Sequence, residues 1–249
     1  ALSDLIASET KEQRKQSLRQ LSGELSAKYE EWRKKLIRTR AEIEAILDFS
    51  DEEDVNKETE SLNLSKDLSA LIKDIDADLE KGVSGVKLRA GLKIVLIGAP
   101  NVGKSSLINI LLKEERAIVS PEAGTTRDIV EARLNLEGIP VTIFDTAGIR
   151  KTDNSIEEEG VQRTEKATKA ADIIVSIREP EKKSLDLSTY NIEKTSKVVK
   201  IVNKIDLIKG KETLFPEELP LSCKTKYGIE GLLKVLGQEA KKLVFLSDM

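Results

Sequence analysis

The first third of the chain alternates apolar and charged positions with the period of an α-helix. Between Leu18 and Leu47, apolar residues recur at steps of three and four residues, and lysine, arginine, glutamate and glutamine fill the positions between them. This spacing predicts one long amphipathic helix, preceded by a shorter one around residues 4–8. A second periodic stretch, from Leu64 to Leu79, predicts a further helix.

Two interruptions divide this helical part. The acidic run 48–54 separates the two periodic stretches, and we favour a solvated loop between helices over a metal site there. Glycines at 82, 85 and 91 predict a hinge before the next element. Two helices alone cannot cover both apolar stripes, so a helical arm that packs on a partner, or on further helices, is favoured over a two-helix hairpin.

After residue 90 the pattern changes to short apolar runs that alternate with amphipathic stretches, which is typical of an α/β domain. Strands are predicted at 92–97, 172–177, 197–202 and 219–222, a hairpin at 129–145, and helices at 104–113, 156–170 and 228–240. The segment 179–195 is short for a full crossover helix, so a trimmed element is expected there. This order predicts a three-layer domain with a mostly parallel six-stranded sheet and one antiparallel strand. The expected division is a helical domain at 1–90, an α/β domain at 91–240 and the stub of a returning helical segment at 241–249.

The amino-acid composition excludes several kinds of functional site but says less about the fold. Charged residues make up 34% of the chain, and the formal net charge of −3 does not favour a strong electrostatic grip on nucleic acid. Because the chain contains no histidine, histidine triads, histidine general bases and HExxH zinc sites are excluded. Any chemistry must run on carboxylates, hydroxyls, backbone amides and ions.

The sequence also bears on compartment and completeness. No apolar run approaches the ~18 residues that a membrane span needs, so no membrane partner is expected, and the start of the chain does not resemble a signal peptide. The single cysteine allows no internal disulfide, which favours a cytoplasmic location. The chain begins with Ala1 directly in the helical pattern, so a fragment of a longer protein is expected.

A glycine-rich loop stands between the first predicted strand of the α/β domain and the helix after it. It reads Gly98-Ala99-Pro100-Asn101-Val102-Gly103-Lys104-Ser105-Ser106. The glycines let backbone N–H groups turn inward around a phosphate chain, and the helix N-terminus adds partial positive charge. Lys104 can reach the outer phosphates, and the Ser105 hydroxyl can bind Mg²⁺. The strand, loop and helix context favours a phosphate-binding loop, or P-loop, over a plain turn.

Two later loops carry residues that suit a nucleotide switch. The first contains the pair Thr125 and Thr126. A threonine hydroxyl there can complete the Mg²⁺ shell only when a γ-phosphate is present, although surface threonines are common. The second loop ends the predicted hairpin and reads Asp145-Thr146-Ala147-Gly148. Asp145 can hold Mg²⁺ through water, and the Gly148 amide can sense the γ-phosphate.

Two more loops favour guanine as the base. The strand at 197–202 leads into Asn203-Lys204-Ile205-Asp206. The Asp206 carboxylate can accept paired hydrogen bonds from the N1–H and exocyclic amine of guanine, which adenine lacks, while Asn203 and Lys204 brace the base and the loop. The last strand leads into Ser222-Cys223-Lys224, which can contact the guanine carbonyl. Each motif alone is weak or moderate, but four in this order predict a Ras-like P-loop GTPase domain that binds GTP and GDP.

The residues alone leave the catalytic group open. In Ras-type enzymes a glutamine after the DTAG-like motif orients the attacking water, and the corresponding residue here is Ile149. Either hydrolysis is slow or another group orients the water. The run Glu157-Glu158-Glu159 begins the next predicted helix. From the residues alone, the favoured interpretation is that these acids complement the helix dipole. The alternative is that one of them positions the attacking water.

Several of these motifs resemble one branch of the P-loop GTPases. The P-loop, the run 124–128 and the run 145–150 resemble the TrmE–Era–EngA GTPases. The helical lead-in and the run 156–163 are similar in particular to the MnmE (TrmE) family of tRNA modification GTPases, and the similarity runs from Ala1 to about Ala240. The resemblance implies a K⁺-stimulated GTPase whose G domains dimerise across their nucleotide faces. It also implies that the family partner MnmG takes part in modifying the wobble uridine of certain tRNAs at carbon 5, with a one-carbon unit from a tetrahydrofolate.

The resemblance implies roles for individual residues. Glu157 matches the catalytic glutamate that helps to position water, and the switch residues Thr126 and Gly148 complete the catalytic set. Ser105 and Thr126 match the Mg²⁺ ligands. The residues that match the K⁺ site by position are Asn101, Ser120, Glu122 and Thr125.

Parts of the family pattern are not found in this sequence. They are the folate-binding and dimerisation domain, most of the returning helical part and the C-terminal cysteine motif; position 223 is usually alanine. The chain is therefore expected to hydrolyse GTP but not to complete the tRNA chemistry by itself. One alternative is an Era-like ribosome-assembly GTPase, which the near-neutral charge and missing RNA-binding domain argue against. The other is a binding module switched by GTP without hydrolysis, whose helical arm docks on MnmG or a ribosomal particle.

Overall fold

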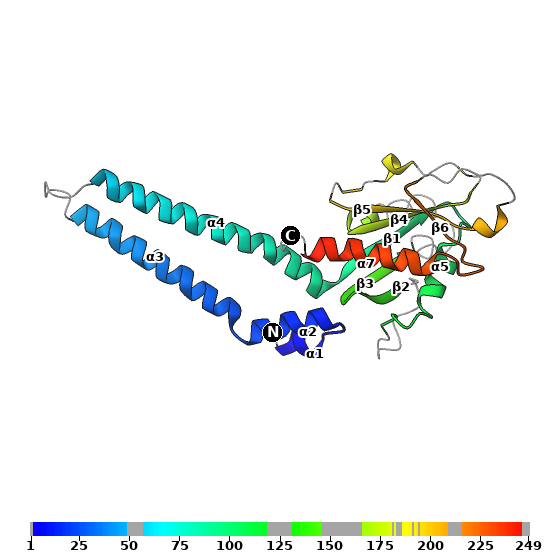
Figure 1. The fold of residues 1–249 in the computed structure, drawn as a ribbon, viewed down its shortest axis with the longest axis horizontal. Coiled ribbons are helices and arrows are strands. Elements are labelled where there is room, and N and C mark those ends of the chain that lie inside the picture. Colours follow the sequence, from blue (N-terminus) through cyan, green and yellow to red (C-terminus); the bar gives the residue numbers. More distant parts are fainter. Residues whose placement is uncertain are drawn as a thin grey trace, which may run out of the picture. The chain divides into compact units, whose positions relative to one another are not determined.

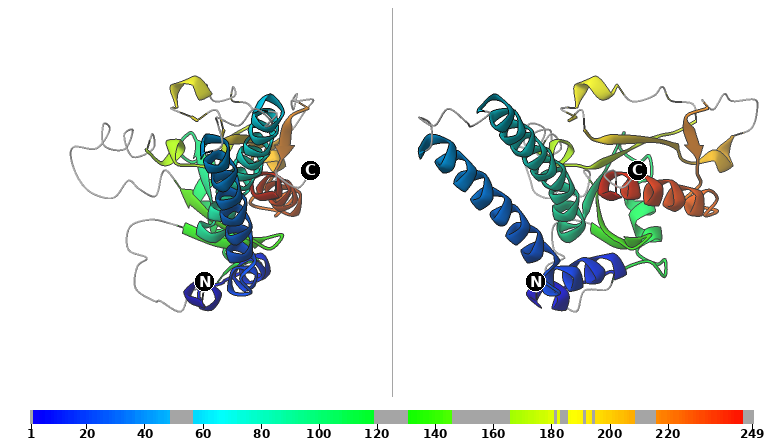
Figure 2. Two further views of the ribbon diagram at one scale, coloured as in Figure 1. Left: turned by 90° about the vertical axis from the view of Figure 1, so that its left-hand side faces the viewer. Right: turned by 60° about the vertical axis from the view of Figure 1, so that its left-hand side comes forward.

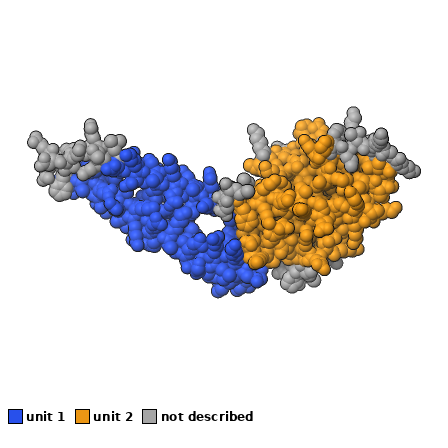
Figure 3. Space-filling model, in the orientation of Figure 1, with its two compact units in different colours: residues 1–8, 14–86 blue, residues 9–13, 87–249 orange. Residues whose placement is uncertain are grey.

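The computed structural model describes residues 2–48, 57–118, 131–145, 166–180, 182, 186–190, 192–193, 195–208 and 216–245 (Figure 1), and for residues 57–62 it describes the backbone alone. The chain divides into two compact units (Figure 3). The first unit comprises Ala1–Ser8 and Arg14–Val86, and the second comprises Glu9–Gln13 and Lys87–Met249.

The described residues before the sheet form helices. These are α1 (Leu2–Ile6), α2 (Lys11–Leu21), α3 (Glu24–Asp48) and α4 (Lys57–Ala90). The prediction of one continuous helix from residue 18 to residue 47 is wrong, because α2 ends and α3 begins within that range. Gly23 has a φ of 84°, a left-handed conformation that ends helices and that glycine adopts without strain. The apolar period continues across this break, so the period alone does not reveal it.

Helix α4 is longer than the sequence pattern predicts. Gly82 and Gly85 lie inside it, so the predicted hinge at these two positions is wrong, and only Gly91, with a φ of 78°, follows its end. A glycine in a helix interior costs about 1 kcal/mol relative to alanine, which a helix of 34 residues can absorb. Gly85 also makes room for α2. The Gln16 Nε2 donates to the Gly85 carbonyl oxygen at 3.1 Å, and a Cβ at position 85 would lie 2.7 Å from that nitrogen.

Polar contacts join α3 to α4, which lie side by side in the first unit (Figure 1). The Trp32 Nε1–H donates to Asp74 Oδ2 at 2.7 Å, and Lys28 forms an ion pair with Asp78. The Lys28 Nζ also lies 5.3 Å from the centroid of the Trp32 ring, which is within cation–π range. These contacts fix which turn of α3 faces which turn of α4.

The described residues of the second unit form a six-stranded sheet. Its strands are β1 (Leu92–Gly98), β2 (Glu131–Leu136), β3 (Ile139–Asp145), β4 (Ile173–Arg178), β5 (Lys197–Val202) and β6 (Glu218–Pro220). Their order is β2-β3-β1-β4-β5-β6; β2 is antiparallel to β3, and the pairs β1–β3, β1–β4, β4–β5 and β5–β6 are parallel. The predicted mostly parallel α/β sheet with one antiparallel strand is confirmed.

Apart from the exposed Lys93, strand β1 is buried on both faces of the sheet. Leu92, Ile94 and Leu96 belong to the larger apolar cluster of this unit, whereas Val95 and Ile97 belong to a second cluster. Successive side chains of a strand point to opposite faces, so the two clusters lie on opposite sides of the sheet. A strand covered on both faces needs a continuous apolar run, which is why the predicted strand at 92–97 shows no alternation.

Helices α5 (Lys104–Leu111) and α7 (Ile229–Phe245) pack against β2 and β3 (Figure 2). Helix α7 runs past residue 240, so residues 241–245 continue this helix. The 3-10 helix η1 (Leu187–Thr189) is the short element expected between β4 and β5. Of the predicted helix 156–170, residues 166–169 are helical and residues 156–165 lie outside the described residues, as does most of the acidic run 48–54.

The strand ends bring the predicted site residues to one edge of the sheet. The carboxyl ends of neighbouring parallel strands meet there: β1 ends at Gly98, β3 at Asp145, β4 at Arg178 and β5 at Val202. Within the described ranges, none of the helices combines the length and the apolar character that a membrane span requires.

Candidate functional site

The P-loop follows β1 directly and ends at the first turn of α5. Gly103 is the N-terminal cap of this helix, and Lys104 begins it. The Lys104 side chain is 5% exposed, and its Nζ donates to the carbonyl oxygens of Gly98 at 2.8 Å and Ala99 at 2.9 Å. The ammonium group is thus held over its own loop, next to the N-terminus of α5. An ammonium beside the N–H groups of a helix start is suited to bind phosphate oxygens.

The conformation of the P-loop requires glycine at position 103. Gly103 has a φ of 107°, and a Cβ there would lie 2.2 Å from Asn203 Nδ2. Only glycine adopts this conformation readily and leaves room for the asparagine. Asn101 has a φ of 61°, a left-handed conformation in which asparagine is enriched, and it is exposed. Val102 is buried at 1% exposure, whereas Ser106 is exposed in the first turn of α5.

Ser105 and Asp145 meet between the P-loop and the end of β3. The Ser105 hydroxyl donates to Asp145 Oδ2 at 2.6 Å, and Asp145 is fully buried. These are hard oxygen donors of the kind that Mg²⁺ takes, so the pair fits an ion bound by the hydroxyl directly and by the carboxylate through water. No group of three or more cysteine, aspartate or glutamate side chains among the described residues is placed to hold a metal. Phosphate oxygens and water can supply further ligands to an Mg²⁺ ion at this pair.

The Asn203 side chain joins the P-loop to the last loop of the sheet edge. Its Nδ2 donates to the Val102 carbonyl oxygen at 2.8 Å, and its Oδ1 accepts from the Cys223 amide at 3.1 Å. Asn203 is 1% exposed. Both contacts need a side chain that donates and accepts at once, which an asparagine amide does and an aspartate carboxylate does not. Three loops that lie far apart in the sequence are thereby fixed at one place.

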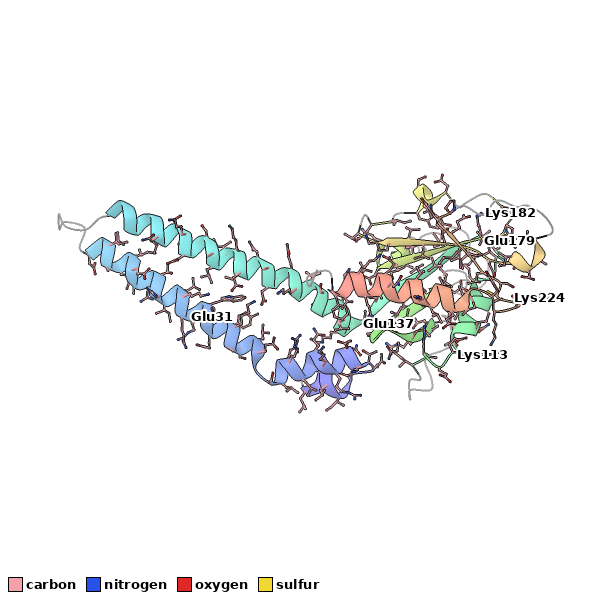
Figure 4. All side chains as sticks on the ribbon, in the orientation of Figure 1. Glu31, Lys113, Glu137, Glu179, Lys182 and Lys224 are labelled. Carbon is pink, nitrogen blue, oxygen red and sulfur yellow. The ribbon has the colours of Figure 1, made fainter. Side chains whose placement is uncertain are left out.

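The Asp206 carboxylate is oriented by the same last loop. The Ser222 hydroxyl donates to Asp206 Oδ1 at 2.6 Å and accepts from the Thr225 amide at 3.2 Å. Ser222 is fully buried, whereas Asp206 is exposed on the 3-10 helix η2 (Ile205–Leu207). The arrangement holds a carboxylate in fixed orientation at the surface. Lys204, which precedes η2 with a φ of 66°, forms an ion pair with Glu179. Glu179 is labelled in Figure 4.

Cys223 contributes its backbone to the site more than its thiol. Its amide meets Asn203, and its Sγ lies 4.0 Å from the Gly103 carbonyl oxygen. Burial raises the pKa of the Cys223 thiol above its ordinary value, so the thiol stays protonated at neutral pH and is a poor nucleophile. Lys224, next in the chain, is exposed (Figure 4).

The described part of the site thus comprises the P-loop, Asp145 and the two loops that follow β5 and β6. The remaining predicted site residues lie outside the described residues: Ser120, Glu122, Thr125, Thr126, Thr146, Ala147, Gly148 and Glu157. Their roles in catalysis and in binding Mg²⁺ and K⁺ stay predictions.

Sequence reasoning missed a buried ion pair beside these loops. Arg178 ends β4 and Glu218 begins β6, and the two side chains are paired at 7% and 3% exposure. A cation that closes an apolar strand could have drawn attention to Arg178. Nothing in the sequence distinguishes Glu218 from its acidic neighbour Glu217.

Known proteins resemble the chain along nearly its whole length. The family model described as the MnmE helical domain matches residues 1–247. A tRNA modification GTPase MnmE of Roseobacter denitrificans is 40% identical over 237 residues, which cover 94% of this chain and 51% of that protein. The MnmE of Rhodopseudomonas palustris is 42% identical over 240 residues, which cover 94% of this chain and 53% of that protein. Among solved structures, the FeoB G domain of Methanococcus jannaschii aligns with 60% of this chain and 98% of its own, at 28% identity and a TM-score of 0.44.

The chain spans about half the length of the curated relatives that it matches. The predicted resemblance to MnmE is confirmed by the family model and by these relatives. Since the family model spans nearly all of its residues, the chain belongs to the MnmE helical domain family.

Proposed function

We propose that this chain is the GTP-binding and GTP-hydrolysing part of a tRNA modification GTPase. The observation that carries the proposal is the Asn203 side chain, which ties the Val102 carbonyl of the P-loop to the Cys223 amide of the last loop. The Asn203 side chain therefore bridges the phosphate-binding loop and the base-reading loop and fixes the distance between them. This arrangement suits one ligand that has a phosphate chain at one end and a flat base at the other.

The Asp206 carboxylate supports guanine as that base. With one oxygen held by Ser222, the carboxylate is pre-oriented to accept from the N1–H and the exocyclic amine of guanine. Adenine has an unprotonated N1 and no amine at the corresponding carbon, so it would leave the carboxylate without partners. A fixed acceptor that loses its donors discriminates strongly between the two bases.

Lys104, Ser105 and Asp145 would hold the phosphate end. The Lys104 Nζ can exchange its backbone carbonyl partners for outer phosphate oxygens, which carry full negative charge. Ser105 and Asp145 would hold Mg²⁺, which offsets negative charge on the transferred phosphoryl group when it is bound. The protein residues bind and orient the nucleotide here, and the attack of water requires a further group.

The finer proposals concern hydrolysis and assembly and rest on the family resemblance. We assign water positioning to Glu157, the Mg²⁺-binding hydroxyl of the switch loop to Thr126, and sensing of the γ-phosphate to Gly148. A K⁺ ion would be held by Asn101, Ser120, Glu122 and Thr125 and would stimulate turnover by offsetting phosphate charge. The G domains would dimerise across their nucleotide faces.

The whole-protein role is proposed on the names of the relatives. The relatives are tRNA modification GTPases, so this chain would supply GTP hydrolysis to the cytoplasmic modification of the wobble uridine at carbon 5, together with MnmG. Since the chain spans about half of those relatives, the test of the tRNA step belongs to the full-length protein.

Base reading is tested by exchanging Asp206→Asn. Xanthine carries a carbonyl where guanine carries the exocyclic amine, and an asparagine amide can donate to that carbonyl. We expect the variant to lose affinity for GDP and to gain relative affinity for XDP, measured by titration with fluorescent nucleotides. Glu230→Gln, an exposed change on α7, is the control. Unchanged preference for GDP in the Asp206 variant would contradict guanine reading by this residue.

Hydrolysis is tested by GTP turnover in KCl and in NaCl at equal ionic strength. We expect faster turnover in KCl, and severe loss of turnover with retained GDP binding in Glu157→Ala, but not in the control Glu230→Ala on α7. Equal rates in both salts would rule out the K⁺ proposal. Tight GTP binding without turnover in either salt would favour a nucleotide-switched binding module. Gel filtration with a GDP–metal-fluoride mimic in both salts tests dimerisation.

A further inference from the structure

A buried guanidinium lies directly beside the two loops that hold Asn203, Asp206 and Ser222. The Arg178 Nε donates to Glu218 Oε1 at 2.7 Å, and Nη2 pairs with Oε2 of the same carboxylate. This pair crosses the end of β5, because β5 lies between β4 and β6 in the sheet. The hydrogen bonds with Glu218 raise the pKa of Arg178 above its ordinary value. Two charges are taken out of water here, which is costly unless the geometry and the remaining hydrogen bonds are good.

The third nitrogen of the guanidinium organises the backbone that follows β4. The Arg178 Nη1 donates to the carbonyl oxygens of Glu179 at 3.1 Å, Pro180 at 3.0 Å and Lys182 at 3.1 Å. Arginine presents donors in a planar fork, so one side chain can fix a carboxylate and a curved backbone together. An apolar side chain of similar size would fill the space but would not hold these carbonyl groups.

The backbone around Arg178 and Glu218 supports both base-reading loops. The backbone N–H of Asn203 donates to the Arg178 carbonyl oxygen at 2.9 Å, and the backbone N–H of Leu221 donates to the Val202 carbonyl oxygen at 2.8 Å. Strand β6 begins at Glu218 and ends at Pro220, and the loop that carries Ser222 follows it. The spacing between the two loops is therefore set by the strands that the ion pair clamps.

The residue after Arg178 reaches the loops through its own side chain. Glu179 pairs with the Lys204 ammonium, and Lys204 lies two residues before Asp206 in a left-handed conformation. Because the Glu179 carbonyl is held by Arg178, the carboxylate of Glu179 is presented to Lys204 from a fixed backbone. The dipeptide Arg178-Glu179 at the end of β4 thus contacts both loops indirectly. Arg178 pairs with Glu218, which begins the strand before Ser222, and Glu179 pairs with Lys204, which precedes Asp206.

We propose that Arg178 is a positioning residue for base recognition, acting with Glu218 on the strand that leads to Ser222 and through Glu179 on Lys204. It does not contact the nucleotide. It fixes the separation and orientation of the loops that carry Asp206 and Ser222. The inference rests on the proposed function, in which Asp206 reads guanine.

The test compares affinities for GDP and IDP, which differ only in the exocyclic amine of the base. Arg178→Met combined with Glu218→Leu removes both charges together, so that neither is left buried alone. We expect the ratio of GDP affinity to IDP affinity to fall by roughly tenfold, because small displacements of positioned groups have large effects. A role in stability alone would lower the folded fraction but leave this ratio unchanged.

The chain offers a matched control for this variant. Lys200 on β5 and Glu217, the residue before β6, form an exposed ion pair across the same two strands at 3.2 Å. Lys200→Met combined with Glu217→Leu removes that pair, and its GDP to IDP ratio should equal that of the unaltered chain. Circular dichroism establishes folding of both double variants.

Two single variants keep the proposal open to contradiction if the buried double variant does not fold. Arg178→Lys keeps the charge but loses the planar fork, and Glu179→Gln removes only the pairing with Lys204. Each should lower the ratio by less than the double variant does. An unchanged ratio in the folded double variant, or in both single variants, overturns the proposal. If the unaltered chain itself binds GDP no better than IDP and ADP, guanine reading fails instead, whatever Arg178 does.

Discussion

The two units of the molecule bury their apolar side chains to very different extents. In the described residues of the first unit, Trp32 and Leu71 are the buried apolar side chains, while Leu79, Val83 and Val86 are more than half exposed on α4. In the second unit, a cluster that includes Leu134 and Ile143 at 0% exposure is enclosed between the sheet and its helices. The unit that carries the nucleotide motifs therefore has a complete core of its own.

This difference shows that each unit is stabilised internally by a different kind of interaction. The second unit relies on close packing, in which each lost methylene group leaves a cavity. The first unit relies on helix propensity and on directed polar contacts such as Trp32 with Asp74 and Lys28 with Asp78. Substitutions of the same kind should therefore have unequal effects in the two units.

The largest expected effect comes from the same truncation made in each unit. Leu134→Ala should destabilise the second unit by about 2–5 kcal/mol, because Leu134 is fully buried and its site cannot collapse easily. Leu79→Ala, at 64% exposure on α4, should change stability by less than about 0.5 kcal/mol. Hydrogen exchange of peptides from each unit measures both changes separately. Comparable losses at the two positions would contradict the comparison.

Much of the second unit could be predicted from sequence, because its core leaves a strong pattern. From Ile94 to Ile97 the run that forms β1 is apolar without alternation, since this part of the strand is covered on both faces. The ends of the parallel strands bring distant loops to one edge of the sheet. The motif residues Lys104, Ser105 and Asn203 could be singled out because loop chemistry at strand ends is encoded in a few consecutive positions.

The predictions that failed depended on one residue or on pairs far apart. The break at Gly23 is set by a single backbone angle, and the apolar period continues past it. Gly82 was expected in a hinge but lies in a helix that its neighbours stabilise. The pair of Arg178 and Glu218 joins residues 40 positions apart, and each charge alone resembles a solvated surface residue.

Intermediate effects of opposite sign are expected from glycine substitutions in the two units. Gly103→Ala should cost about 1–3 kcal/mol in strain and weaken nucleotide binding, because its φ is 107° and its Cβ would meet Asn203 at 2.2 Å. Gly82→Ala should stabilise the first unit by about 1 kcal/mol, since nothing lies within 4 Å of its Cβ and alanine favours the helix.

Nucleotide titration and hydrogen exchange of α4 measure these two changes. The Gly82 variant serves as the control for nucleotide binding, which it should leave unchanged. A Gly82→Ala variant that destabilises α4 would contradict the expected gain in helix stability.

The smallest effect is expected from the polar contact between α3 and α4. The Trp32 Nε1–H hydrogen bond is the main cause that lowers the pKa of the Asp74 carboxyl, and Lys28 adds to it. A lowered pKa in the folded state means that the contact stabilises the first unit at neutral pH. That stabilisation is complete above the ordinary aspartate pKa, near about 4, and is lost as the pH falls through the lower folded-state value.

Asp74→Asn keeps an oxygen that can accept from Trp32 but removes the charge. Because Trp32 is the single tryptophan of the chain, its fluorescence reports urea unfolding of the first unit alone. We expect a slightly lower urea midpoint at pH 7 and a shallower decline of the midpoint between pH 5 and pH 3. The control is Asp76→Asn, an exposed change on the same helix, which should keep the steeper decline. Equal acid declines in the Asp74 variant and the unaltered chain would mean that the charge of Asp74 does not stabilise the contact, and that apolar packing of Trp32 joins α3 to α4.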